Sequence, residues 1–249
     1  MKITAVTLDV VGGPAHVETL DLDDPQKGEV LVKMGASGVC HSDQHVITGQ
    51  DQADLPCVLG HEGAGDVVAV GSDVVSVEVG DKVALNWVPS CKACFYCQRN
   101  QHHLCPEVTQ RIWTGYMADG TSRISRSGQP ILHFSGISTW ADHMVVPQEC
   151  CQVIDAAVPY EVAAIVGCAV ATGVGAALHR GNISPGDKVA VVGAGGVGLS
   201  AIMGAKMAGA EQIIAIDREL SKRQMSEDLG ATDFVVADDA AVDNVIRLT

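Results

Sequence analysis

Four cysteines lie close together near the middle of the chain, at Cys91, Cys94, Cys97 and Cys105. A tetrahedral Zn²⁺ takes four thiolate ligands, and a loop of this length can wrap them around one ion. The spacing therefore predicts a zinc site whose four positions are all filled by protein, so that the metal stabilises a lobe and does not react. An iron–sulfur cluster or a pair of disulfides are the alternative interpretations.

The bulk properties place limits on the kind of protein. A length of 249 residues with 47% hydrophobic content is enough for one or two domains with a buried core. The net charge of -14 argues against nucleic acid and anionic membranes as partners. The N-terminal segment has no apolar core of a leader, and no apolar run approaches the ~18 residues of a membrane span. We therefore expect a soluble, cytoplasmic chain. In that setting, nine cysteines with tight local spacings favour metal ligation over disulfides.

The pattern of residues changes character along the chain. Before Pro147, short Val-rich runs such as 29–34, 65–70 and 81–85 alternate with turn residues, which predicts mostly β-structure. The polar stretch 106–141 is long enough to be a functional loop. Beyond Pro159 the sequence becomes alanine-rich and predicts alternating helices and strands. We expect helices over 160–178, 199–208 and 221–229, and strands over 188–192, 212–216 and 233–236.

A glycine-rich turn joins the first of these later strands to a helix. It contains Gly193, Gly195, Gly196, Val197 and Gly198. Glycines in this context permit a tight turn and the close approach of a pyrophosphate to a helix N-terminus, which is typical of a dinucleotide site.

An acidic residue follows at the end of the next strand. Asp217 is expected to accept hydrogen bonds from the adenosine ribose and to repel a 2′-phosphate, which favours NAD over NADP. Arg218 beside it could lie over the adenine or meet a phosphate.

Three further residues have metal-ligand chemistry but no informative spacing. Cys40, His61 and Cys168 each lie in an apolar context, where a lone cysteine or histidine is more often part of the core. From the residues alone, both interpretations stay open.

Several segments, taken in order, carry a family resemblance. They are GVCHSDQHVITG at 38–49, LGHEGAG at 59–65, the cysteine cluster, DGTSR at 119–123, GCAVATG at 167–173 and VVGAGGVGLS at 191–200. Through them the whole chain resembles the first two thirds of a medium-chain, zinc-dependent alcohol dehydrogenase. The resemblance implies an α/β protein with a GroES-like, β-rich catalytic domain over residues 1–169. An incomplete Rossmann dinucleotide-binding domain would follow over residues 170–249.

The resemblance also implies roles for individual residues. Cys40, His61 and Cys168 would hold a second, catalytic zinc with one open position, and Glu62 would be a nearby carboxylate that tunes the metal. Ser42 and His45 would relay a proton to solvent; the alternative is a helix-capping serine and a surface histidine. The implied cofactor contacts add His41, Thr172 and Lys222, with a solvated surface charge as the alternative for Lys222. Ser42, Trp87 and Phe134 would line an apolar substrate pocket.

The implied activity is hydride transfer between a zinc-bound alcohol, as its alkoxide, and NAD, which interconverts primary alcohols and aldehydes. The cofactors would be two Zn²⁺ per chain and NAD, and the full-length form is expected to be a homo-oligomer. A glutathione-dependent formaldehyde dehydrogenase is a related alternative, but that branch has an arginine where this chain has Thr109. The alternative from another class is a non-catalytic, zinc-stabilised binding module.

The length of the chain departs from the family pattern. A dinucleotide fold of this type uses six parallel strands, and only three candidate strands follow residue 187. We interpret the sequence as a truncated form, with an edge strand left bare. Weak or absent turnover is therefore expected from these 249 residues alone.

Overall fold

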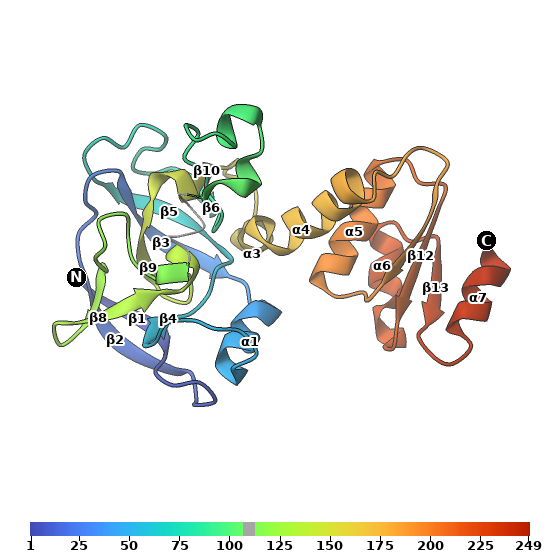
Figure 1. Cartoon of the computed structure of the whole chain (residues 1–249), viewed down its shortest axis with the longest axis horizontal. Helices are drawn as coiled ribbons and strands as arrows, with labels where there is room; N and C mark the ends of the chain where they lie inside the picture. The colour runs from blue at the N-terminus through green and yellow to red at the C-terminus, as the bar shows by residue number, and fades with distance from the viewer. Residues whose placement is uncertain (107–112) are drawn as a thin grey trace. The chain divides into compact units, whose positions relative to one another are not determined.

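A computed structural model describes residues 1–106 and 113–249, and these residues form two compact units (Figure 1). Unit 1 covers Met1–Cys168 and unit 2 covers Ala169–Thr249. Each unit has a hydrophobic core of its own, so each is described by itself.

Unit 1 contains a small closed barrel and a five-stranded sheet. The barrel has the order β1 (Lys2–Leu8), β2 (His16–Leu22), β7 (Ile124–Arg126), β8 (Gln129–His133) and β4 (Cys57–Val58). The sheet has the order β10 (Cys151–Val153), β6 (Lys82–Leu85), β5 (Gly63–Val70), β3 (Glu29–Ser37) and β9 (His143–Pro147). Apolar side chains from both pack into one core, because alternate residues of each strand point inward. The strands predicted at 29–34, 65–70 and 81–85 are thus confirmed as parts of β3, β5 and β6.

Short helices complete unit 1. Within the described residues they include α1 (His41–Thr48), α3 (Tyr160–Ala164) and the 3₁₀ turns η1 (Cys97–Arg99), η2 (His102–Leu104), η3 (Phe134–Gly136), η4 (Gln148–Cys150) and η5 (Ile165–Gly167). The prediction of one long loop over 106–141 is wrong for residues 124–133, where β7 and β8 pair as an antiparallel hairpin. The sequence pattern did not predict the hairpin, because both of its strands are too short to show clear alternation.

The DGTSR segment has a structural explanation in unit 1. Arg123 is 2% exposed, and its guanidinium donates two hydrogen bonds to Glu29, at 2.7 and 2.8 Å. It donates a third to Asp119 at 2.7 Å. A buried guanidinium requires this full set of acceptors, so the segment ties the barrel to β3.

Unit 2 is a parallel sheet with helices. The strand order is β11 (Lys188–Val192), β12 (Gln212–Asp217) and β13 (Asp233–Val236), with β11 and β13 at the edges. The helical elements are α4 (Ala169–Gly175), the π-helical turn η6 (Ala176–Arg180), α5 (Gly196–Met207), η7 (Leu220–Lys222), α6 (Arg223–Leu229) and α7 (Ala241–Leu248). All three predicted strands are confirmed, as are the helices that became α5 and α6.

The helix predicted over 160–178 is wrong as a single element. It is interrupted at Cys168, whose backbone angles of φ -131° and ψ -79° are not helical. Gly167 packs so closely on β6 that a Cβ there would lie 2.1 Å from the carbonyl oxygen of Leu85. The close packing of Gly167 on β6 accompanies the interruption of the helix at Cys168. The alanine-rich pattern of the sequence could not reveal this contact.

No single helix among the described residues is long and apolar enough to cross a membrane, although one interrupted pair, Tyr160–Gly167 with Ala169–Arg180, passes the length and composition test.

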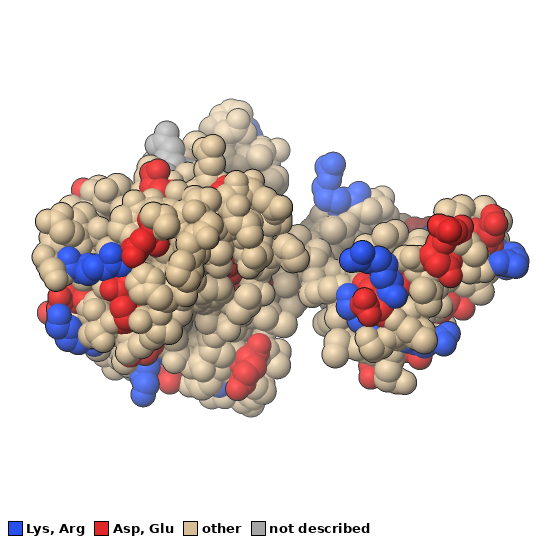
Figure 2. All heavy atoms as spheres, turned by 90° about the horizontal axis from the view of Figure 1, so that it is seen from below, with Lys and Arg blue, Asp and Glu red and all other residues tan. Residues whose placement is uncertain are grey.

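Figure 2 shows acidic and basic side chains interspersed on one face of each unit.

Candidate metal and cofactor sites

Unit 1 brings Cys40, His61 and Cys168 together, with one ligand atom from each within 4.8 Å of the others. We call this group the open site. Cys40 lies between β3 and α1, His61 between β4 and β5, and Cys168 directly after η5. A tetrahedral zinc with ligands at about 2.0 to 2.3 Å needs donor atoms about 3.5 to 3.8 Å apart. Two sulfurs and one imidazole nitrogen within 4.8 Å of one another are close enough for a zinc ion to bind all three and keep a fourth position free.

The acid–base state of the open site suits a cation. The hydrogen bond from Cys168, with a second from His61, lowers the pKa of Cys40 to about 3, so this sulfur is a thiolate at neutral pH. The hydrogen bond to Cys40 and the burial of the thiol raise the pKa of Cys168 well above its ordinary value. A divalent cation would supply the charge that lets the second sulfur ionise, so metal binding is expected to release a proton.

Asp43, which sequence reasoning missed, holds both of the first two ligand residues. Its fully buried carboxylate accepts a hydrogen bond from the Cys40 backbone N–H at 2.9 Å and lies 3.1 Å from Nδ1 of His61. Burial lowers the pKa of His61, but the bonds to Asp43 and Cys40 outweigh it and raise that pKa to about 9. An Nδ1–H bond to a carboxylate leaves Nε2 free to ligate a metal. The signal in the sequence was the acidic residue three positions after Cys40, where a helix N-terminus attracts it.

Glu62 follows His61 and is 3% exposed. It packs against Gly38, where a Cβ would lie 2.0 Å from Glu62 Oε2. The carboxylate therefore lies beside the loop that carries Cys40, and its charge helps to raise the pKa of Cys168. The structure thus places Glu62 next to the open site.

Two aromatic rings flank His61. The rings of Trp87 and Phe134 each lie with their centroids 5.7 Å from the His61 ring, in edge-on contact. These are the two aromatic residues assigned to the substrate pocket from the resemblance. They give the surroundings of the open site an apolar character.

Three residues of α1 have roles implied by the resemblance: His41 and Ser42 in its first turn and His45 in its last. Ser42 Oγ is 3.7 Å from Cys40 Sγ, so the hydroxyl is next to the open site. His45 is half-buried, and its ring contacts that of the exposed His41 at 5.3 Å between centroids. Ser42 and His45 are three residues apart and share one face of the helix.

The four-cysteine cluster forms a second group, which we call the closed site. The sulfurs of Cys91, Cys94, Cys97 and Cys105 all lie within 4.8 Å of one another. Pairs at 3.9 and 4.0 Å are close to the sulfur spacing of about 3.8 Å in a tetrahedral zinc site. Hydrogen bonds from the backbone N–H groups of Ala93 and Cys94 lower the pKa of Cys91 to about 6. The donor set and its spacing fit a zinc ion without an open position.

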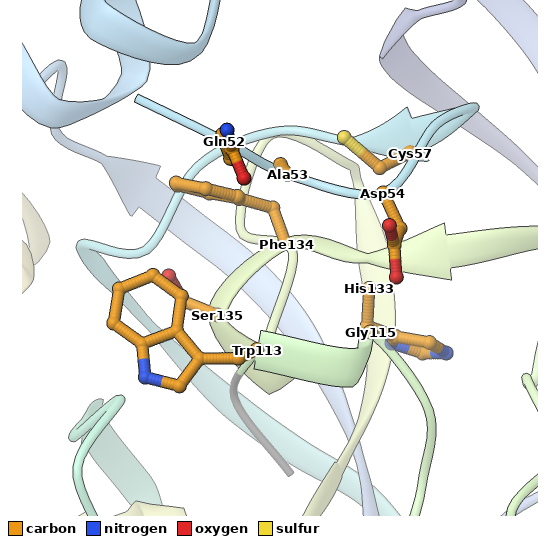
Figure 3. Close-up of a pocket in the computed structure, with 9 residues that line it drawn as sticks. All are labelled: Gln52, Ala53, Asp54, Cys57, Trp113, Gly115, His133, Phe134 and Ser135. Atoms are coloured by element: carbon orange, nitrogen blue, oxygen red, sulfur yellow. The ribbon is translucent and has the colours of Figure 1, made fainter. Parts of the chain in front are cut away.

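A small cavity in unit 1 is lined by Phe134 and eight other residues (Figure 3). Its volume is about 20 Å³, which is room for one water molecule. His133 lines it and is fully buried, and burial lowers the pKa of this imidazole to about 3. Nδ1 of His133 has no hydrogen-bond partner among residues 1–106 and 113–249. Thr109, the position that distinguishes the glutathione-dependent branch, lies outside the described residues.

Unit 2 places the glycine turn at the end of β11, where Gly195 caps α5. A Cβ at Gly198 would lie 1.7 Å from the carbonyl oxygen of Gly193, so only glycine fits there. At Gly193, with φ +93°, and at Gly195, a Cβ would meet no atom within 4 Å. The turn therefore leaves open space at a helix N-terminus, as a bound pyrophosphate requires. Gly196 and Val197 form the first turn of α5.

Asp217 lies next to this turn. Its carboxylate accepts hydrogen bonds from the backbone N–H of Ala194 at 2.7 Å and from Lys222 at 2.9 Å. The Glu219 N–H and Lys222 lower the pKa of Asp217 to about 2. Arg218 and Thr172 are exposed. Hydrogen bonds to Asp217 therefore connect both Lys222 and the glycine turn to this carboxylate.

Taken together, an open Cys–His–Cys site, a closed four-cysteine site and a glycine turn define a zinc- and dinucleotide-binding class of protein. Comparison with known protein families identifies this class. Residues 26–160 match the family model of the alcohol dehydrogenase GroES-like domain, and residues 196–249 match that of zinc-binding dehydrogenases. The chain therefore belongs to the zinc-binding alcohol dehydrogenase family.

Individual relatives agree with this assignment. The chain is 42% identical over 236 residues to an S-(hydroxymethyl)glutathione dehydrogenase from Synechocystis sp., covering 94% of this chain and 64% of the relative. The structure of an alcohol dehydrogenase zinc-binding domain protein from Burkholderia ambifaria superposes with a TM-score of 0.92 at 33% identity, over 100% of this chain and 67% of that one. Benzyl alcohol dehydrogenase from Acinetobacter calcoaceticus superposes with a TM-score of 0.90 at 31% identity, over 100% and 68%. The chain thus spans about two thirds of the length of these relatives.

Proposed function

We propose that this protein is a zinc-dependent, NAD-linked dehydrogenase that interconverts primary alcohols and aldehydes. The observation that carries the proposal is the open site. Three ligand atoms of suitable chemistry lie within 4.8 Å, and the buried Asp43 fixes the imidazole among them. A zinc site with three protein ligands is the arrangement that catalysis uses, whereas four ligands serve structure.

The residues around the open site have distinct tasks in this proposal. When bound there, zinc acts as a Lewis acid that lowers the pKa of an alcohol hydroxyl. The nicotinamide ring, when bound, would be the hydride acceptor. Ser42 would receive the proton of the alcohol hydroxyl as it gives up its own, and His45 would pass a proton on to solvent. Trp87 and Phe134 exclude water and favour an apolar alcohol. Glu62 lies close enough to tune the charge of the site.

The cofactor assignment rests on unit 2. The glycine turn offers space and a helix N-terminus to a pyrophosphate, with His41 and Thr172 as further contacts implied by the family. Asp217 would accept hydrogen bonds from the adenosine ribose, and its negative charge supports NAD over NADP. Lys222 already contacts Asp217 and would lie near the same ribose.

The name shared by several curated relatives at 40–42% identity favours a second candidate, the oxidation of S-(hydroxymethyl)glutathione. This reaction has the same chemistry at the open site and differs in the substrate it selects. We place it second because Thr109 stands where that branch has an arginine for the glutathione carboxylate.

The test is NADH formation with a panel of primary alcohols and S-(hydroxymethyl)glutathione. It is measured on the 249-residue chain and on a version extended to the length of its relatives. We expect turnover from the extended version, loss of that turnover in Cys40→Ser, and little turnover from the 249-residue chain. An extended version that binds zinc in both sites but oxidises none of these substrates would support the non-catalytic binding module.

The remaining part of the proposal concerns surroundings and assembly. Six of the nine cysteines lie in the two metal-ligand groups, which supports a reducing, cytoplasmic location. We also propose a homo-oligomer for the full-length form and no binding to nucleic acid or membrane, as the net charge of -14 favours.

A further inference from the structure

Two ligands of the open site come from loops that are distant in sequence. Gly38 precedes Cys40 by two residues, and Gly60 directly precedes His61. Residues 138–140, which connect η3 to β9, contact both loops, and we call this segment the brace.

Thr139 of the brace binds the loop that carries His61. Its backbone N–H donates to the Gly60 carbonyl at 2.9 Å, and its hydroxyl donates to the Glu62 carbonyl at 3.0 Å. Ser37, at the end of β3, donates to the same Glu62 oxygen at 2.8 Å and lies 2.8 Å from the Thr139 hydroxyl. Because Thr139 is 1% exposed, no water competes for these bonds.

Trp140 contacts both loops with one side chain. Its indole N–H donates to the Gly38 carbonyl at 2.9 Å. The same ring lies against Gly60, where φ is +88° and a Cβ would be 2.3 Å from Trp140 Cδ1. The rigid ring therefore fixes the distance between a residue two before Cys40 and a residue one before His61.

We propose that the brace is a positioning device that sets the spacing of Cys40 and His61 before the metal binds, with Trp140 as its main contact. The inference rests on the proposed assignment of the open site to zinc. Ligands held at their final spacing lose less conformational freedom when the metal binds, so affinity rises. Trp140 is not one of the three ligands, and it acts through the backbone of the two loops.

Cobalt titration tests this proposal without any activity measurement. The protein holds zinc in its closed site, and Co²⁺ is added while thiolate-to-cobalt absorption is followed; Cys40→Ser identifies the signal of the open site. We expect Trp140→Phe, which keeps a ring and removes the N–H, to weaken cobalt binding by about tenfold and to shift the spectrum. Trp113→Phe is the matched control, since it makes the same change away from both loops.

A second pair of variants guards against simple misfolding of Trp140→Phe. Thr139→Val keeps the shape and removes the hydroxyl, and Thr139→Ser restores the hydroxyl. We expect weaker cobalt binding in the first and recovery in the second, while the core variant Ile131→Val leaves cobalt affinity unchanged.

Two results would overturn the inference in different ways. If the unchanged protein shows the open-site signal and neither Trp140→Phe nor Thr139→Val weakens binding, the brace has no positioning role. If the unchanged protein shows no open-site signal, the zinc assignment fails, and the proposed function fails with it.

Discussion

The carboxylate of Asp43 lies 3.1 Å from Nδ1 of His61, and both side chains are buried. The same carboxylate accepts the backbone N–H of Cys40, so one residue orients two of the three open-site ligands. It also fixes which imidazole nitrogen is left for a metal.

This relationship predicts the effect of Asp43→Asn. The amide keeps the shape but loses the charge that holds the imidazole, so zinc affinity of the open site should fall by about 10- to 100-fold. Competition with a zinc chelator measures the change, and Asp51→Asn, at an exposed position close by, is the control. Equal affinities in Asp43→Asn and the unchanged protein would show that Asp43 does not orient the ligand.

The closed site should govern stability. Replacing Cys97 by serine removes one of four ligands. We expect the free energy of unfolding of unit 1 to fall by several kcal/mol, which is part of the about 10–16 kcal/mol that binding of a structural zinc supplies. Thermal unfolding followed by circular dichroism measures it. Cys57→Ser is the matched control, because it makes the same change at a cysteine that is equally buried but belongs to neither metal group. If both variants unfold at the same temperature, the closed site is not structural.

Asp217 should select between the two nicotinamide cofactors. Asp217→Asn removes the charge that would repel a 2′-phosphate. The affinity for 2′-phospho-ADP-ribose should therefore rise by at least about tenfold relative to the affinity for ADP-ribose, which corresponds to about 1.4 kcal/mol of binding free energy. Isothermal titration of the two ligands measures the ratio. Asp233→Asn, at the start of β13, should leave it unchanged. A preference for the phosphorylated ligand in the unchanged protein would reverse the NAD assignment.

Acid should weaken the Asp119–Arg123 contact. Burial raises the pKa of Asp119, but hydrogen bonds from Arg123 and Thr121 outweigh it and lower that pKa from 3.8 to about 2. The ion pair thus stabilises the fold above the unfolded value and loses this effect as pH falls from 3.8 toward 2. Because Asp119 is 43% exposed, we expect its contribution to be about 1 kcal/mol or less.

Urea unfolding between pH 5 and pH 3 measures this effect. The stability difference between the unchanged protein and Asp119→Asn should narrow as the pH falls. Ile124→Val changes no charge, so its difference should stay constant across the same range. A difference for Asp119→Asn that grows in acid would contradict the sign of the pKa shift.

The sequence predicted the parts of the structure that repeat a strong local pattern. The strand over 233–236 is confirmed with the same bounds, because a short apolar run between polar turn residues leaves few other choices. The four closed-site cysteines form one group, as their short spacing requires. The helix α7 was missed, since it is short and only its apolar face packs on the sheet.

Long-range relationships were beyond the sequence pattern. The break at Cys168 accompanies the packing of Gly167 against Leu85, which is distant in sequence. The role of Asp43 depends on His61, eighteen residues away, and the brace depends on contacts between Trp140 and two separate loops. Such contacts leave no periodic trace, so a single sequence cannot reveal them.

Zinc content per chain tests the central claim most directly. Metal analysis of the purified protein should give two zinc ions, with one lost in Cys40→Ser while the closed site keeps its own. A single tightly held zinc, unaffected by Cys40→Ser, would contradict the account, because the open site would then bind no metal.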